Sequence, residues 1–135
     1  MKLGATLYVK DSYEAVERYK EAFGLELGYH LSYEDIDGLK AWGYNMGEDY
    51  KPYKGYFHAE LIRDGNEVFA VSGEGDEKLV SGHNVQLGLN LGSEEAVKRA
   101  VSVLSDGKVT AAPCSYNPCV ADVVDKYGVW WFISV

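Results

Sequence analysis

The fold is decided by one stretch of sequence, Asn84-Val-Gln-Leu-Gly-Leu-Asn-Leu91, together with the segment Gly92 to Leu104 that follows it. Apolar and polar side chains alternate up to Leu91, which is the pattern of a β-strand with one face on a core. From Ala96 onwards the apolar side chains recur at helical spacing. Ser93 is a favourable N-cap residue for that helix. The stretch therefore predicts a strand that leads directly into a helix.

The same strand and helix occur a second time near the N-terminus. A shift of 81 positions places Ser93 on Ser12 and Leu104 on Phe23, and the strand before Ser12 also alternates. A strand and a helix matched in this way indicate an internal duplication. A chain of 135 residues is long enough for one domain and short for two. We therefore predict a single domain, 1–135, made of two modules at about 1–74 and 82–135.

Each module continues with three further strands. In the first module the strands are expected at 25–33, 56–62 and 67–72, and in the second at 108–113, 120–124 and 129–135. Asp64-Gly65 is a strong hairpin signal, and further turns are expected at 115–118 and 125–128. The prediction is an α+β fold in which two βαβββ modules form one curved mixed sheet, with both helices on the convex side and a concave cavity on the other.

One long segment, 34–55, breaks this regular pattern. Glycine and proline interrupt it, and Trp42, Tyr44, Tyr50 and Tyr53 are scattered through it. A long irregular segment inside a small domain usually carries function. We expect a flap over a pocket or a contact between two subunits.

The charge of the chain limits the kinds of partner. The net charge is −8 and the isoelectric point is near 4.8, so neither nucleic acid nor an anionic membrane is expected to bind. Cationic or neutral ligands fit better. No apolar run is long enough to span a membrane, and Lys10 interrupts the first apolar stretch, so a cytoplasmic location is expected. Cys114 and Cys119 are expected to be free thiols.

Strand alternation also predicts a ligand-binding face. If the apolar positions face the helices, the opposite set lines the cavity, and this set comprises Thr6, Tyr8, His58, Glu60, Gln86, Asn90, Trp130 and Ser134. Aromatic rings with a few convergent polar groups are typical of a small-molecule pocket. His58 and Glu60 are two residues apart, so they share a face and are candidates for an acid/base pair.

Each of these residues also has a structural interpretation. His58 and Glu60 can form a pair with no catalytic role. Tyr8 and Trp130 either fill the space between modules or contact a ligand. Gln86 and Asn90 need partners if their strand is buried, and these can be each other, water or a second subunit.

Three segments resemble a known family, namely Ala15–Gly24, Phe57–Leu61 followed by Asp64-Gly65, and Val124–Trp131. They resemble the vicinal oxygen chelate superfamily, which includes glyoxalase I, extradiol dioxygenases, and fosfomycin-resistance and bleomycin-resistance proteins. The PhnB-like (3-demethylubiquinone methyltransferase-like) branch is the most similar. The resemblance implies paired βαβββ modules and a homodimer, while the chemistry varies widely among proteins that share one fold.

Metal-using members of this superfamily hold a divalent ion at four positions that, to within about a residue, fall near Gly4, Ala70, Gln86 and Phe132. Of these, only Gln86 has a side chain that can coordinate a metal. We therefore expect no metal and no cofactor.

Two main functions follow from these observations. The first is a metal-free protein that binds a small molecule, as bleomycin-resistance proteins do. The second is a lyase, isomerase or transferase that uses His58 and Glu60, or a divalent metal at ligands not recognised in the sequence. A purely structural dimer is a third. No glycine-rich nucleotide-binding turn supports methyl transfer.

Overall fold

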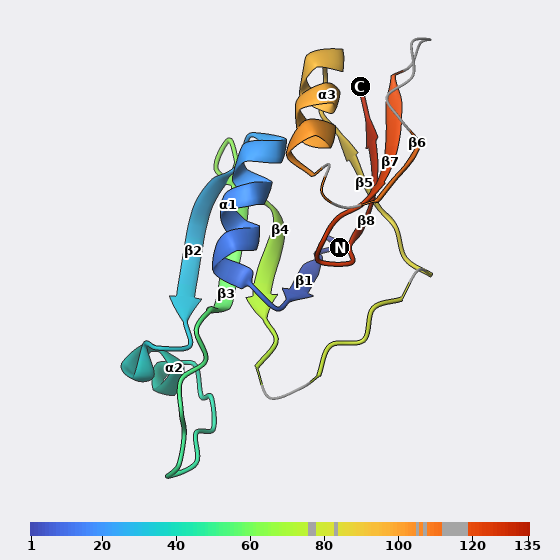
Figure 1. Ribbon diagram of the computed structural model, residues 1–135. Coiled ribbons are helices and arrows are strands. Elements are labelled where there is room, and N and C mark those ends of the chain that lie inside the picture. Colours follow the sequence, from blue (N-terminus) through green and yellow to red (C-terminus); the bar gives the residue numbers. More distant parts are fainter. Residues whose placement is uncertain (76–77, 83, 105, 107, 112–118) are drawn as a thin grey trace. The chain divides into compact units, whose positions relative to one another are not determined.

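The computed structural model describes residues 1–75, 78–82, 84–104, 106, 108–111 and 119–135, of which 108–111 are described by their backbone (Figure 1). These residues form two compact units. The first contains Met1–Val16 and Glu26–Leu79, and the second contains Glu17–Leu25 and Val80–Val135. Helix α1 (Ser12–Phe23) therefore begins in the first unit and ends in the second.

The first unit contains a four-stranded sheet in the order β1-β4-β3-β2. Its elements are β1 (Thr6–Val9), β2 (Glu26–Ser32), α2 (Ile36–Ala41), β3 (Tyr56–Arg63) and β4 (Asn66–Gly73). β1 runs parallel to β4, and the other neighbours are antiparallel. Leu7, Val71 and Ala59 are paired across three strands and are all buried, so the predicted alternation places one face of this sheet on the core.

The turn between β3 and β4 has the geometry that its sequence predicts. Asp64 has a φ of 51° and Gly65 a φ of 76°. Two successive residues with positive φ form the type I′ turn that suits the twist of a two-residue hairpin, and glycine adopts this conformation without a steric cost. The hairpin sets the register of β3 against β4 next to the turn, and a register shift between Leu61 and Ile62 then places Glu60 opposite Ala70.

The second unit contains a sheet of the same topology, in the order β5-β8-β7-β6. Its elements are β5 (Leu87–Asn90), α3 (Glu94–Val103), β6 (Lys108–Ala111), β7 (Val120–Val124) and β8 (Trp130–Ser134). The Ser93 hydroxyl caps α3 by accepting a hydrogen bond from the Ala96 N–H at 3.2 Å. The C-terminal half of α1 contributes Tyr19 and Phe23, whose rings contact the buried Trp131.

These topologies confirm the α+β fold and the two βαβββ modules, but the prediction of one sheet is wrong. The described strands form two separate sheets of four. Hydrophobic alternation specifies which face of a strand is buried, and it carries no information about which strand edges pair between modules. The curvature of the sheets and the concave cavity remain predictions.

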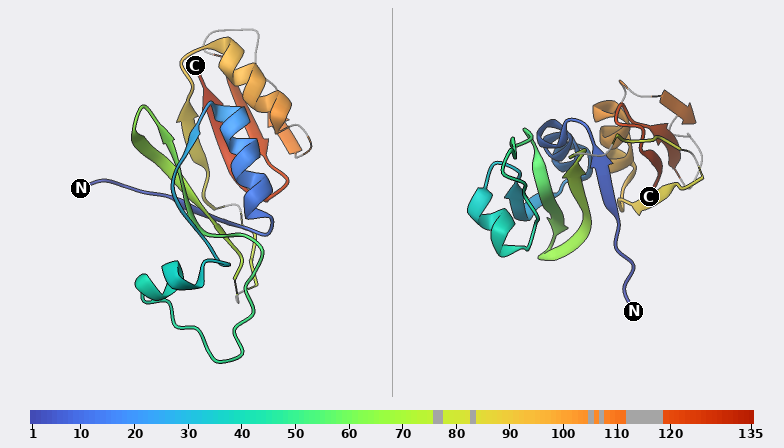
Figure 2. Two further views of the ribbon diagram at one scale, coloured as in Figure 1. Left: turned by 90° about the vertical axis from the view of Figure 1, so that its left-hand side faces the viewer. Right: turned by 90° about the horizontal axis from the view of Figure 1, so that it is seen from below.

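Some element boundaries also differ from the expectation. β5 begins at Leu87, three residues later than predicted, and segment 34–55 contains the short helix α2. The Asp35 side chain caps α2 by accepting a hydrogen bond from the Gly38 N–H at 2.9 Å, and Leu39 is fully buried. Figure 2 shows α2 and the segment that follows it at the end of β2 and the start of β3.

The duplication is confirmed, but its strands and its helices are related by shifts that differ by one residue. The buried residues Val9 and Leu91, which precede the two helices, are 82 positions apart, whereas Ser12 and Ser93 are 81 apart. The turn predicted at 115–118 lies outside the described residues, as do His83 and Cys114. Cys119 is buried and free. Among the described residues no helix has both the length and the apolar character needed to cross a membrane.

Candidate functional site

A β-bulge brings Tyr29 to the face of the first sheet that lies opposite the buried side chains of Leu7, Ala59 and Val71. Leu27 pairs with Leu61 and His30 pairs with Ala59, so β2 has two residues where β3 has only Glu60. Such a bulge changes which side chains of the strand point to each face. Strict alternation from the buried Leu25 would put Tyr29 on the buried side of the strand, yet Tyr29 is 50% exposed and its ring centroid lies 6.4 Å from that of His58.

Trp42 reaches the same face from the end of α2. It is the C-cap residue of that helix, which the buried Leu39 holds in place. The Trp42 indole Nε1–H donates a hydrogen bond to the Tyr29 hydroxyl at 2.8 Å. The two rings are inclined by only 12°, with centroids 6.2 Å apart, and Trp42 is 53% exposed. Its ring also lies 5.8 Å from that of His58.

His58 and Glu60 share one face of β3, as predicted. His58 Nε2 lies 3.6 Å from Glu60 Oε1, which is longer than a direct hydrogen bond and within the range of an ion pair when the imidazole is protonated. Both side chains are partly buried. We call Tyr29, Trp42, His58 and Glu60 the Glu60 cluster. It combines a carboxylate with exposed aromatic rings, the groups that hold organic cations in proteins.

Thr6 and Tyr8 extend the same face onto β1. Thr6 pairs with Ala70, and Ala70 pairs with Glu60, so the three residues form one row across the sheet. Tyr8 lies two residues beyond Thr6 and is exposed. The structure therefore places four of the predicted residues on one face of the first unit.

The other four predicted residues belong to the second unit, namely Gln86, Asn90, Trp130 and Ser134. The Gln86 Nε2 amide donates to Asp122 Oδ1 at 2.8 Å and to the Trp131 carbonyl at 3.4 Å. The Asn90 side chain bonds to the Val135 carbonyl and the Gly92 N–H. Both amides are exposed, and these partners lie within their own unit. Trp130 is partly buried on β8.

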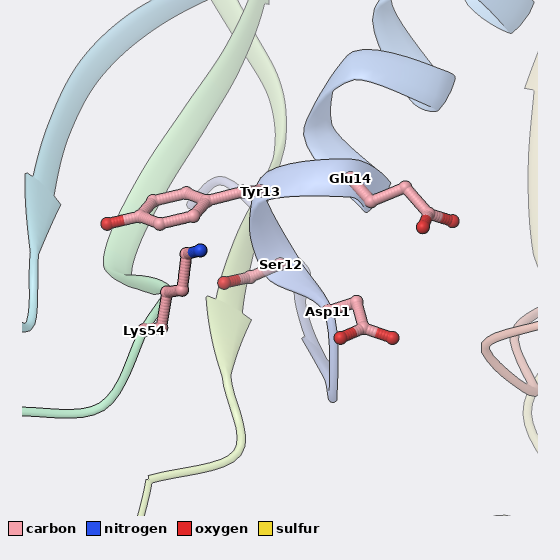
Figure 3. Close-up of a pocket in the computed structure, with 5 residues that line it drawn as sticks. All are labelled: Asp11, Ser12, Tyr13, Glu14 and Lys54. Carbon is pink, nitrogen blue, oxygen red and sulfur yellow. The ribbon is translucent and has the colours of Figure 1, made fainter.

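Two shallow pockets lie near the N-terminal end of α1, away from the predicted residues. One, of about 230 Å³, is lined by Asp11, Ser12, Tyr13, Glu14 and Lys54. Figure 3 shows the Lys54 ammonium between the Tyr13 ring and the Ser12 hydroxyl, with the carboxylates of Asp11 and Glu14 on the other side. The second pocket, of about 220 Å³, shares Lys54. Their mixed charges favour no single class of ligand.

Asp125 is the buried charged residue that organises the second unit. Its Oδ2 accepts hydrogen bonds from the Tyr19 hydroxyl and from Trp131 Nε1, the latter at 2.9 Å, and Oδ1 accepts from the N–H groups of Tyr127 and Val129. Burial, together with the charge of Asp125, raises the pKa of the Tyr19 phenol far above its ordinary range. This arrangement is structural, because it orders the turn before β8.

The residues at the positions that the resemblance assigns to a divalent ion do not suit one. Ala70 and Phe132 have hydrocarbon side chains, Gly4 has none, and the Gln86 amide donates to Asp122 and to the Trp131 carbonyl. Within the described part of the chain, no group of three or more His, Cys, Asp or Glu residues could hold a metal ion.

Comparison with known proteins extends the description of the fold. No family model and no curated protein matches the sequence. A PhnB protein from Bacillus cereus has a similar structure, with a TM-score of 0.71, 20% sequence identity, and coverage of 99% of this chain and 98% of that chain. Protein PA1353 from Pseudomonas aeruginosa has a TM-score of 0.67 and 20% sequence identity, with coverage of 98% of this chain and 97% of that chain.

A third similar structure belongs to a protein of known resistance function. The fosfomycin resistance protein FosX from Mesorhizobium loti has a TM-score of 0.62 and 9% identity, over 100% of this chain and 91% of that chain. Identities this low establish the fold and leave the activity open. The chain thus has the fold of the vicinal oxygen chelate superfamily, and the resemblance seen in its sequence is confirmed at the level of the fold.

Proposed function

We propose that this protein binds a small organic molecule through the Glu60 cluster, without a metal ion, and that it favours ligands with a cationic group on a flat or aromatic body. One observation carries this proposal. The nearly parallel rings of Tyr29 and Trp42 are half exposed, and they lie beside the pair formed by His58 and Glu60.

The interaction energies available at the Glu60 cluster favour a cation over an anion. A cation above an exposed aromatic face gains about 0.5–1 kcal/mol, and more when it loses its water. An ion pair between the ligand cation and the partly exposed Glu60 carboxylate contributes at most about 1 kcal/mol more. The net charge of −8 also raises the local concentration of cations and repels anions. Because Trp42 is bonded to Tyr29, its ring is held in place before a ligand arrives, which lowers the entropic cost of binding.

The test compares two probes of similar size and opposite charge. Benzyltrimethylammonium is expected to raise the melting temperature of the protein, while benzoate is expected to leave it unchanged. A thermal melt of the purified chain with each probe measures this difference. A panel of small molecules that yields only anionic ligands would contradict the proposal.

Two variants locate the binding. Glu60→Gln is expected to raise the Kd of benzyltrimethylammonium about fivefold, because it removes a contact of about 1 kcal/mol. Glu67→Gln removes the same charge from an exposed position on β4 and is the matched control. Isothermal titration calorimetry measures both constants. An equal loss of affinity in both variants would show that only net charge matters.

The contact between His58 and Glu60 also supports a second candidate, an enzyme. The two side chains are partly buried on one face, with Nε2 and Oε1 3.6 Å apart, so they have the geometry of an acid/base pair in a lyase, isomerase or transferase. His58→Gln would then lower kcat by far more than it weakens binding. Elemental analysis of the purified protein tests the variant of this candidate that needs a divalent metal.

A further inference from the structure

The Glu60 carboxylate has a basic side chain beside it within its own cluster. His58 Nε2 lies 3.6 Å from Glu60 Oε1, and both side chains are partly buried. Across the described residues, Glu60 is the one ion-pair partner of His58, and it has no other itself. An imidazole changes its charge between about pH 5 and 8, whereas a carboxylate stays ionised there. The net charge of the pair in this range therefore depends on one proton.

The aromatic rings of the cluster lie beside the same imidazole. The centroid of the His58 ring is 5.8 Å from that of Trp42 and 6.4 Å from that of Tyr29. A cation within about 6 Å of an indole ring is attracted by its face. A protonated His58 thus has both of the contacts proposed for a ligand, a carboxylate and an aromatic ring. The imidazolium and the ligand cation need the same groups.

Other titratable side chains flank the cluster, namely Tyr8 on β1, Tyr29 and His30 on β2, and Asp37 and Lys40 on α2. Strand β4 adds none opposite Glu60, where it presents Ala70. Phenols, carboxylates and lysine ammonium groups do not titrate between about pH 5 and 8. Asp37 and Lys40 are exposed and form no ion pair with a described residue. His30 is the other imidazole on this sheet, and its Nδ1 is bonded to the Gly28 carbonyl.

We infer that His58 is an internal competitor of the ligand and switches cation binding at the Glu60 cluster with pH. This inference rests on the function proposed above. When the imidazole is neutral, the Glu60 carboxylate is available to the cationic group of a ligand. When the imidazole is protonated, it pairs with Glu60 and repels a second cation. Affinity is therefore full at the alkaline end of the range, and it falls as the pH falls.

The test measures the Kd of benzyltrimethylammonium for the full chain at about pH 7.5 and about pH 5.5 by isothermal titration calorimetry. The charge of this probe is permanent, so a change in Kd comes from the protein. Loss of the Glu60 contact weakens binding about fivefold, and most but not all of an ordinary imidazole is protonated at the lower pH. We therefore expect the Kd to rise by about threefold or more on acidification.

Two variants assign this effect to one side chain. In His58→Gln the Kd is expected to be nearly the same at both pH values, whatever its absolute value, because an amide is polar and does not titrate. His30→Gln removes the exposed imidazole on β2 and is the matched control. It is expected to retain the increase in Kd seen in the wild type.

A measurement on the wild type keeps the test decisive if His58→Gln folds poorly. Because protonation of His58 weakens ligand binding, the ligand must in turn displace that proton. Calorimetric titrations at about pH 6 in two buffers with different enthalpies of ionisation count the protons released. We expect the release of a fraction of one proton at this pH and almost none at about pH 8.

The possible outcomes separate this inference from the function on which it rests. Binding with the same Kd at both pH values, an equal change in His58→Gln, or proton uptake in place of release would overturn the switch and leave the proposed function standing. Loss of the pH effect in His30→Gln would also overturn it. The absence of binding at either pH would contradict the proposed function, and the switch with it.

Discussion

At the scale of single residues, Asp125 connects helix α1, strand β8 and the turn before that strand. Its carboxylate is buried and accepts four hydrogen bonds, two from side chains and two from the backbone of its turn. Replacing it leaves buried donors without partners, which costs more than the bonds themselves contribute. The Val124–Trp131 segment, which carries part of the family resemblance, is therefore a structural element.

Asp125→Ala is expected to lower the free energy of unfolding by about 3 kcal/mol or more, because it removes a buried acceptor of several hydrogen bonds. Urea denaturation followed by tryptophan fluorescence measures the change. Asp49→Asn, an exposed position outside both sheets, is the control and should change stability by less than about 0.5 kcal/mol. A similar small effect for both variants would mean that this network contributes little.

Tyr19 makes stability depend on pH in the alkaline range. In the folded chain its pKa is raised by burial and by Asp125, whereas in the unfolded chain it is ordinary, near 10. Tyr19 therefore contributes fully to the free energy of unfolding below about pH 10. This contribution falls as the pH rises further, because only the unfolded state loses the phenol proton.

The expected result is a free energy of unfolding that decreases between about pH 9.5 and 11, with a smaller decrease in Tyr19→Phe. Urea denaturation at several pH values measures both slopes. The slopes are compared and not the absolute stabilities, because the variant also loses its bond to Asp125. Identical slopes in the two proteins would contradict the assignment.

At the scale of elements, the two helices begin differently although their sequences are duplicated. Ser93 caps α3. Ser12, its counterpart at the start of α1, is fully buried, and its hydroxyl accepts a hydrogen bond from the Tyr56 N–H at 2.8 Å. Ser12 thus joins α1 to the first residue of β3, the strand that carries His58 and Glu60.

Ser12→Ala is expected to lower the free energy of unfolding by about 1–3 kcal/mol, because the Tyr56 N–H loses its partner. Ser93→Ala should cost about 1 kcal/mol through the loss of a cap, and it is the matched comparison. Hydrogen exchange distinguishes the two, since only Ser12→Ala should speed the exchange of the Tyr56 amide. Unchanged exchange at Tyr56 would contradict the role given to Ser12.

The elements also show which structural signals the sequence contains. Strand alternation and the Asp64-Gly65 turn were sufficient to predict β3 and β4, since both signals depend on local chemistry. The bulge in β2 was missed, although Gly28 inside a strand is a known sign of one. Tyr29 was consequently assigned to the wrong face, and Trp42 could not be placed because α2 has only six residues.

At the scale of the whole molecule, the duplication made the topology predictable. One strand and helix recognised twice imply two modules of the same strand order, and the structure has them. The single sheet was not predictable, because nothing in a strand sequence says which edge it pairs with. His58 and Glu60 were identified by their spacing, because residues two apart in a strand share a face. The homodimer and the cytoplasmic location remain predictions.

The most direct test of the central claim is the ¹⁵N spectrum of the tryptophan indole groups during a titration with benzyltrimethylammonium. Trp42 is half exposed in the Glu60 cluster, whereas Trp131 is buried and bonded to Asp125. We predict a saturable shift of the Trp42 indole signal and an unchanged Trp131 signal. An unmoved Trp42 signal at saturating ligand would contradict binding at the Glu60 cluster.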